Sequence, residues 1–384
     1  MLKAKKPLYF GISLQQEYFI ASCKSGGLMF HKEFMMIPLA KREVERRCED
    51  IEKQLPRQSE RYNVLVLGLG SVSRLSSHRH LARTRKYLLE DLDAVELLGY
   101  NKVGDDSFSN QIPLLTGLRE QDVGRGPFFD DLDLIWKKYS SLGYYTMFLE
   151  DNPIYGLFHY RASGYRTQPT DYDPRSVLLA MELLLTSDPK ECDGEISKAA
   201  LSLNYTSSLL TFLNDKHPLF IYAWLSSVTE ADVNGPRKMD AMLQNFLQQL
   251  QASGVLNNTI VIFVSDHGMR FGPIRRSVSG GYEDRLPFSF LVFPPGFKNR
   301  HDDAMKNLRR NRYRLVTPFD VHTTLLELTC LATGCKETDH SRQRGEKKAK
   351  FGTKFGISIL HEIPENRTCR DASVTPHWCA CHPP

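Results

Sequence analysis

Short, continuous apolar runs separated by stretches of helical periodicity constrain the fold of this chain more than any other feature. The clearest run, Thr-Ile-Val-Ile-Phe-Val at residues 259–264, ends directly before a polar segment. Similar runs occupy residues 63–68, 144–149 and 219–224. Runs of this length and composition are typical of strands that are buried on both faces of a parallel sheet.

Amphipathic stretches lie between these runs. Residues 81–92 and 240–250 carry apolar side chains at helical spacing, and the charged residues 41–55 are also expected to form a helix. Strands that alternate with helices predict an α/β fold with a mostly parallel sheet sandwiched between helices. In such folds ligands bind beyond the carboxyl ends of the strands.

The pattern divides the chain into a short N-terminal segment, residues 1–60, and a large domain, residues 61–384. The first segment is weakly patterned, and the core strands begin just after it. The chain is 41% hydrophobic and 25% charged, which is the composition of an ordinary globular protein. Its 384 residues suffice for one large core, so we expect one α/β domain rather than two smaller ones.

Charge and hydropathy argue against two classes of partner. The net charge of +5 is spread over 50 basic and 45 acidic residues, and the densest basic runs, residues 309–312 and 346–348, are short. Solvated surface charge explains such runs better than a nucleic-acid interface does. No apolar stretch approaches the roughly 20 residues that span a bilayer. We therefore predict neither a nucleic-acid partner nor a membrane span.

Cysteine spacing and glycosylation sequons indicate the compartment. The eight cysteines contain no CxxC pair, so disulfides fit better than a zinc ribbon. Sequons begin at Asn204, Asn257 and Asn366. Together they predict a disulfide-bonded glycoprotein that is extracellular or in the lumen of the secretory pathway. The alternative to disulfides near the C-terminus is a small metal cluster made of His377, Cys379, Cys381 and His382.

The polar segment after residues 259–264 reads Ser265-Asp266-His267-Gly268. It places a carboxylate and an imidazole side by side at the end of a predicted strand, where they are able to ligate a divalent cation. The alternative role of such a pair is a structural hydrogen bond, which is the commoner case. The tetrapeptide alone leaves both roles open.

Several sequence blocks in a fixed order carry a family resemblance. The longest, at residues 99–117, supplies a hydroxyl at Ser107 and then an apolar segment that ends in Thr-Gly. The other blocks are residues 71–74, 169–172, 265–272, 282–287, 317–322, 367–372 and 377–381. These blocks resemble the DUF229 family of animal proteins, a branch of the alkaline-phosphatase/sulfatase superfamily. The resemblance runs from the first core strand almost to the C-terminus.

The resemblance implies an alkaline-phosphatase-like core and a metal-dependent attack on a phosphate or sulfate ester. Ser107 stands where the family has its candidate nucleophile. Asp266 and His267 would hold a divalent cation (Zn, Mn, Mg or Ca), which lowers the pKa of the hydroxyl and neutralises charge on the transferred group. An anionic ester or glycan ligand would be bound by basic residues, namely Arg74, Lys102 or Arg270. A surface or helix-end charge is the alternative role for each of these three.

Two segments depart from the family pattern. The strand at residues 63–68 normally leads into a metal-ligating aspartate, and this chain has Gly70 in its place. A second segment has Glu230 and Ala231 where the family shows His-Asp. Glu230 or Asp232 would be the remaining oxygen donor for a cation. Loss of a charged ligand weakens both metal affinity and activation of the nucleophile.

Two functions therefore compete. One is a sulfatase- or phosphatase-like hydrolase with a weakened metal centre. The other is a catalytically inactive member that has lost the cation and binds a glycan, a phosphorylated ligand or a protein partner. Nicotinamide binding, suggested by the glycines at residues 68 and 70, is disfavoured because the third glycine of that fingerprint is missing. Asp320 is expected to have a structural role at a helix start. His322 is expected to face either the core or the site, and the core is favoured.

Overall fold

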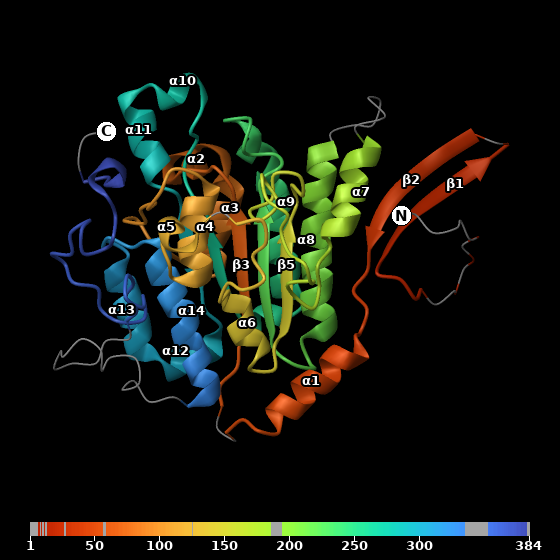
Figure 1. Ribbon diagram of the computed structural model, residues 1–384, viewed down its shortest axis with the longest axis horizontal. Coiled ribbons are helices and arrows are strands. Elements are labelled where there is room, and N and C mark those ends of the chain that lie inside the picture. Colours follow the sequence, from red (N-terminus) through yellow and green to blue (C-terminus); the bar gives the residue numbers. More distant parts are fainter. Residues whose placement is uncertain are drawn as a thin grey trace.

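A six-stranded sheet forms the centre of the protein (Figure 1). The computed structural model describes residues 7, 9, 11, 14–26, 28–56, 59–124, 126–185, 194–334 and 352–381. The strand order is β4-β8-β7-β3-β6-β5. These strands are β3 (Asn63–Leu69), β4 (Val95–Glu96), β5 (Tyr145–Glu150), β6 (Leu219–Leu225), β7 (Thr259–Val264) and β8 (Ser289–Val292).

Helices connect the strands. In chain order they are α1 (Arg42–Glu52), α2 (Arg74–His80), α3 (Ala82–Lys86), α4 (Ser107–Thr116), α5 (Glu120–Val123), α6 (Ile135–Ser140), α7 (Arg175–Leu185), α8 (Gly194–Leu213), α9 (Gly235–Ala252), α10 (Gly272–Arg275), α11 (Val278–Arg285), α12 (Pro295–Arg300), α13 (Asp302–Asn311) and α14 (Pro318–Thr333). The predicted helix at residues 240–250 falls inside α9. The one predicted at residues 81–92 is formed by α3 and the π-helical turn Tyr87–Asp91.

The sheet is mostly parallel, as predicted. β3 pairs in parallel with β6 and β7, and β5 pairs in parallel with β6. β8 runs antiparallel to both β7 and β4. The four apolar runs of the sequence became β3, β5, β6 and β7, and every residue of β3, β6 and β7 is buried. The strands at one edge, β4 and β8, were not identified from the sequence.

Both faces of the sheet are covered because successive side chains of a strand point in opposite directions. Leu65, Leu67 and Leu69 of β3 pack with buried side chains of α8 and α9. Val64 and Val66 pack on the opposite face with buried side chains of α4 and α14. The predicted sandwich of a sheet between helices is therefore confirmed (Figure 1).

The N-terminal segment forms an antiparallel hairpin of β1 (Tyr18–Ser25) and β2 (Leu28–Met36), which lies to the right of the sheet in Figure 1. Its first strand has only intermediate and exposed residues, so no buried apolar run marks it in the sequence. α1 follows, and Arg47 joins this helix to Asp171 by an ion pair of 2.6 Å.

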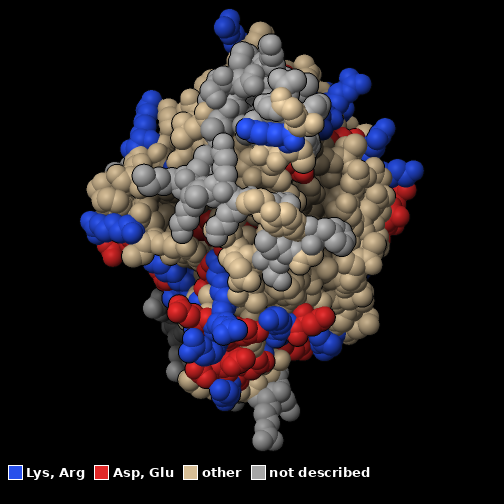
Figure 2. All heavy atoms as spheres, turned by 90° about the vertical axis from the view of Figure 1, so that its right-hand side faces the viewer, with Lys and Arg blue, Asp and Glu red and all other residues tan. Residues whose placement is uncertain are grey.

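Figure 2 views the molecule from the side of this hairpin. Basic and acidic side chains interleave at the lower end of the molecule in this view, where Figure 1 places α1. Charged side chains are sparser on the upper part of this face. Ion pairs on and around α1, such as Lys53–Asp50 and Lys216–Glu45, join opposite charges. Among the described helices, none is both long and apolar enough to cross a bilayer.

Candidate functional site

The candidate site lies beyond the carboxyl ends of β3, β6 and β7. Asp266 and His267 follow β7 after one intervening residue, Ser265, and Gly70 and Ser71 follow β3. Ser107 is the first residue of α4. Parallel strands deliver such segments to one edge of a sheet, where side chains distant in sequence meet.

The Asp266 carboxylate is buried and surrounded by donors. Its Oδ1 accepts hydrogen bonds from the backbone amides of Ser71 (3.1 Å) and His267 (3.0 Å), and its Oδ2 accepts one from the side-chain amide of Gln111 (3.2 Å). Burial acts to raise the pKa of Asp266. The His267 imidazole and hydrogen bonds from the Ser71 amide and Gln111 nevertheless hold this pKa below its ordinary value. The carboxylate is thus ionised, and protein groups satisfy it.

The loop after β3 is shaped by these contacts. Ser71 has a φ of 62°, in the left-handed region that residues other than glycine rarely adopt. This conformation directs its amide to Asp266, while the next amide, of Val72, donates to Ser265 Oγ (3.0 Å). The backbone after β3 therefore supplies hydrogen bonds to the segment after β7.

Ser107 and His267 form a hydroxyl–imidazole pair. Ser107 Oγ lies 3.3 Å from His267 Nε2, and His267 Nδ1 lies 2.7 Å from the Gly268 carbonyl oxygen. Because a carbonyl only accepts, Nδ1 carries the proton, which leaves Nε2 of the neutral ring to accept from the hydroxyl. Burial lowers the pKa of His267, Asp266 acts in the opposite direction, and the charges of Lys102 and Arg270 lower it further.

The two cations near His267 differ in availability. Lys102 is fully buried. Its Nζ lies 2.7 Å from Asp284 Oδ1 and 4.0 Å from the centre of the Trp378 ring. Its charge is therefore balanced inside the protein. Arg270 donates to Asp105 over 3.1 Å, and the Asp105 side chain is 66% exposed. This ion pair is partly open to solvent and lies beside the start of α4.

Glu230 belongs to the electrostatic environment of the site, whereas none of the contacts that Arg74 makes with the described residues places it there. Burial, with the negative charges of Asp266 and Asp151, raises the pKa of Glu230 to about 7, and Arg270 acts in the opposite direction. Arg74 begins α2, and its charge acts on the pKa of His78.

The donors present do not fit the ligand set of a tightly held divalent cation. Gly70 has no side chain, and Asp266 Oδ2 and His267 Nε2, which lie 3.7 Å apart, both have hydrogen-bond partners. Within the described part of the chain, no third His, Cys, Asp or Glu lies close enough to share a cation with this pair. Two ligands without a further carboxylate leave the charge of a cation poorly compensated.

Sequence reasoning missed Gln111 and Tyr222. Gln111 lies one helical turn after Ser107 on α4, a spacing that places both side chains on one face of the helix. Tyr222 donates from its hydroxyl to Gln111 Oε1 (2.6 Å), and Gln111 in turn donates to Asp266. The chain Tyr222–Gln111–Asp266 orients the carboxylate from the face of the sheet that α4 covers.

The roles expected for Asp320 and His322 are confirmed. Asp320 Oδ2 accepts from the backbone amide of Thr317 at the start of α14 (2.8 Å), and Arg367 donates to both carboxylate oxygens. His322 is buried, its Nδ1 lies 2.9 Å from the Leu114 carbonyl oxygen, and burial lowers its pKa to about 4.

A disulfide joins Cys369 to Cys379, which confirms the predicted use of cysteine. Cys379 is therefore not free for the alternative metal cluster, and His382 of that cluster lies outside the described residues. The asparagines of the three sequons are exposed, as attachment of a glycan requires.

Three solved structures are similar to this chain. The lipoteichoic acid synthase LtaP from Listeria monocytogenes is similar over 82% of this chain and 81% of its own, at 14% identity and a TM-score of 0.48. A protein of the alkaline phosphatase superfamily from Vibrio parahaemolyticus is similar over 77% of this chain and 76% of its own, at 13% identity and a TM-score of 0.47. The PsFucS1 sulfatase from Pseudoalteromonas sp. is similar over 76% of this chain and 72% of its own, at 14% identity and a TM-score of 0.46.

These likenesses concern the fold and carry no statement about activity. No curated protein sequence matches the chain significantly. Residues 5–384 match the family described as "Protein of unknown function (DUF229)". This match spans nearly the whole sequence and agrees with the resemblance that the motifs indicated. The chain is therefore a member of the DUF229 family.

Proposed function

We propose that this protein is a non-hydrolytic member of its family that binds an anionic ester, such as a sulfate or phosphate group on a glycan, outside the cytosol. The observation that carries the proposal is the state of Asp266. Its carboxylate accepts three hydrogen bonds from protein donors, and Gly70 supplies no second carboxylate beside it. Without a cation, the hydroxyl of Ser107 lacks the activation that the metal-dependent reaction implied by the resemblance requires.

The proposal of an anionic ligand is supported by the groups around Ser107. This residue is exposed in part and begins α4, where backbone amides and the helix dipole favour negative charge. Arg270 is near enough to shift the pKa of His267, and its partner Asp105 is easily displaced because it is solvent-exposed. An incoming sulfate or phosphate would replace the Asp105 carboxylate on the Arg270 guanidinium.

Calorimetric titration with inorganic sulfate, inorganic phosphate and p-nitrophenyl sulfate tests this proposal. Saturable binding is expected, and Arg270→Ala should weaken it about tenfold, the effect of losing one charge-assisted hydrogen bond. Arg276→Ala is the matched control, because it removes an equal charge from an exposed position on the same segment. Absence of binding at millimolar concentrations, or release of nitrophenol, would refute the proposal.

A second candidate function rests on the Ser107–His267 pair. With Nε2 as proton acceptor, Ser107 Oγ could attack an ester without a cation, transfer its proton to His267 and expel the alcohol, after which water would release the acid. Turnover of p-nitrophenyl phosphate that persists in EDTA and disappears in both Ser107→Ala and His267→Gln would establish this function. Turnover that persists in Ser107→Ala would exclude it.

A further inference from the structure

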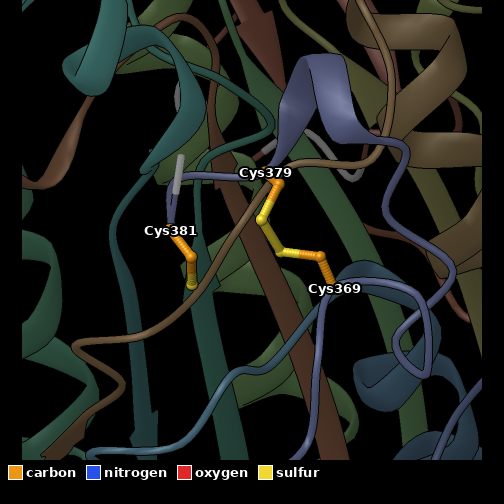
Figure 3. A group of neighbouring side chains, drawn as sticks. All are labelled: Cys369, Cys379 and Cys381. Carbon is orange, nitrogen blue, oxygen red and sulfur yellow. A yellow bond between two sulfur atoms is a disulfide. The ribbon is translucent and has the colours of Figure 1, made fainter. Parts of the chain in front are cut away.

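Three cysteine sulfur atoms gather near the C-terminus. Cys369 and Cys379 are joined as a disulfide, with their Cα atoms 5.9 Å apart, and Cys381 is a free, exposed cysteine. All three sulfur atoms lie within 4.8 Å of one another. Figure 3 shows the Cys381 side chain beside the disulfide, on the same segment as Cys379. A free thiol this close to a disulfide is within reach of it for thiol–disulfide exchange.

The two sulfur atoms that could carry the free thiol differ in environment. Cys379 is buried, at 1% exposure, whereas Cys381 is exposed. A free thiol at residue 381 is solvated, whereas a free thiol at residue 379 would be buried among apolar groups without water around it. The disulfide between Cys369 and Cys379 is therefore the favoured pairing, and a pairing of Cys369 with Cys381 is the minor one.

The cysteine segment is fixed to the segment that leads to the candidate site. The Asn101 side-chain amide donates to the Trp378 carbonyl (2.8 Å), and the Ala380 amide donates to Asn101 Oδ1 (3.0 Å). Lys102 lies over the Trp378 ring. These contacts hold Cys379 and Cys381 in place on either side of Ala380. Movement of Cys381 toward Cys369 must strain or break them.

A groove of roughly 1250 Å³ gives the cluster access to solvent. Its walls include Trp378 and all three cysteines, together with Gly104 and Ser109 near the start of α4. A change in the pairing of the cysteines would therefore alter the wall of a groove beside the candidate site.

We propose that Cys381 is the attacking thiol of an internal thiol–disulfide exchange. The Cys381 thiolate forms a bond to Cys369 Sγ, the bond between Cys369 and Cys379 breaks, and Cys379 leaves as a thiolate that takes up the proton given up by Cys381. One disulfide and one thiol are present before and after, so the step needs no oxidant or reductant. Attack on Cys369 is favoured because a bond from Cys381 to Cys379 would close a ring across a single intervening residue.

The first test is Cys379→Ser, with disulfides mapped in the non-reduced protein by mass spectrometry. The proposal expects a disulfide between Cys369 and Cys381 in this variant. The non-reduced variant should then have two free thiols fewer than the same variant after this disulfide is reduced. Cys379→Ser combined with Cys381→Ser is the matched control and should leave Cys369 free. If Cys379→Ser folds, as judged by circular dichroism, and both remaining cysteines stay free, the proposal is wrong.

A measurement on the unaltered chain keeps the proposal testable if Cys379→Ser does not fold. The protein is held at pH 8, quenched in acid with N-ethylmaleimide and mapped. The exchanged form, with Cys379 labelled and Cys369 bonded to Cys381, should be present at about 1% or more, as expected for a minor state. It should vanish in Cys381→Ala. If the exchanged form makes up less than about 1% of the unaltered chain, the proposed exchange is wrong.

Discussion

Restoring the missing carboxylate by Gly70→Asp is the sharpest perturbation that the structure offers. Gly70 has a backbone conformation open to other residues, and a Cβ added there would lie 3.0 Å from Ser226 Cβ and 3.4 Å from Trp224 Nε1. Ser226 has little freedom to move, since its amide donates to the buried Asp151 carboxylate (2.7 Å). The new side chain fits only with local adjustment.

The cost of this substitution has two parts. Tight packing against Ser226 costs about 1–3 kcal/mol. A second carboxylate near Asp266 adds a repulsion of about 4 kcal/mol at a separation of ~4 Å in an effective dielectric of ~20. Without a cation, Gly70→Asp should therefore be clearly less stable than the unaltered protein. A cation that binds both carboxylates and His267 would offset the repulsion.

The expected gain on adding metal follows from binding to the folded state. At a metal concentration of about 100 times Kd, the folded state gains about 2.7 kcal/mol. An unfolding entropy of about 2.1 cal/mol/K per residue over 384 residues converts this gain into a rise in Tm of about 3 °C. Scanning fluorimetry with Zn²⁺, Mn²⁺, Mg²⁺ and Ca²⁺, together with metal content after dialysis, measures the effect.

Gly70→Asn is the matched control, because it has nearly the same volume but no charge. It should carry the packing cost and show no rise in Tm with metal. The unaltered chain should also show none. If the unaltered chain retains stoichiometric metal and gains as much stability as Gly70→Asp, then Asp266 and His267 hold a cation without residue 70, and the reasoning about the ligand set fails.

Three further predictions concern stability. Lys102→Met should lower the free energy of unfolding by about 3–5 kcal/mol in urea melts, because it leaves the buried Asp284 without its closest cation, and Asp284→Asn in the same chain should recover part of the loss. His322 has a folded pKa of about 4, below the ordinary value of 6.5, so stability should fall by up to roughly 3 kcal/mol as pH drops from about 6.5 to 4. A pH-dependent loss that is undiminished in His322→Phe would contradict that assignment. Ser107→Ala should change stability by about 1 kcal/mol or less, since it removes one partly exposed hydrogen-bonding group, and a larger change in the melt would assign Ser107 a structural role.

The sequence by itself determined the core of the fold. Fully buried parallel strands need apolar side chains on both faces, so β3, β5, β6 and β7 are visible as continuous apolar runs. The apolar run of β7 also placed Asp266 and His267 at the carboxyl end of a predicted strand. The family resemblance added Ser107 to the candidate site residues. The hairpin of β1 and β2 and the two-residue strand β4 lack this local signal and were missed. β8 was also missed, although residues 288–293 form a short, mostly apolar run.

Tertiary structure alone decided what the site residues do. Asp266 is satisfied by Ser71, 195 residues away in the chain, and by Gln111, 155 residues away. Lys102 is paired with Asp284, 182 residues away. Neither pairing leaves a mark in local sequence, because hydrogen bonds and ion pairs between buried groups depend on which loops the sheet brings to one edge.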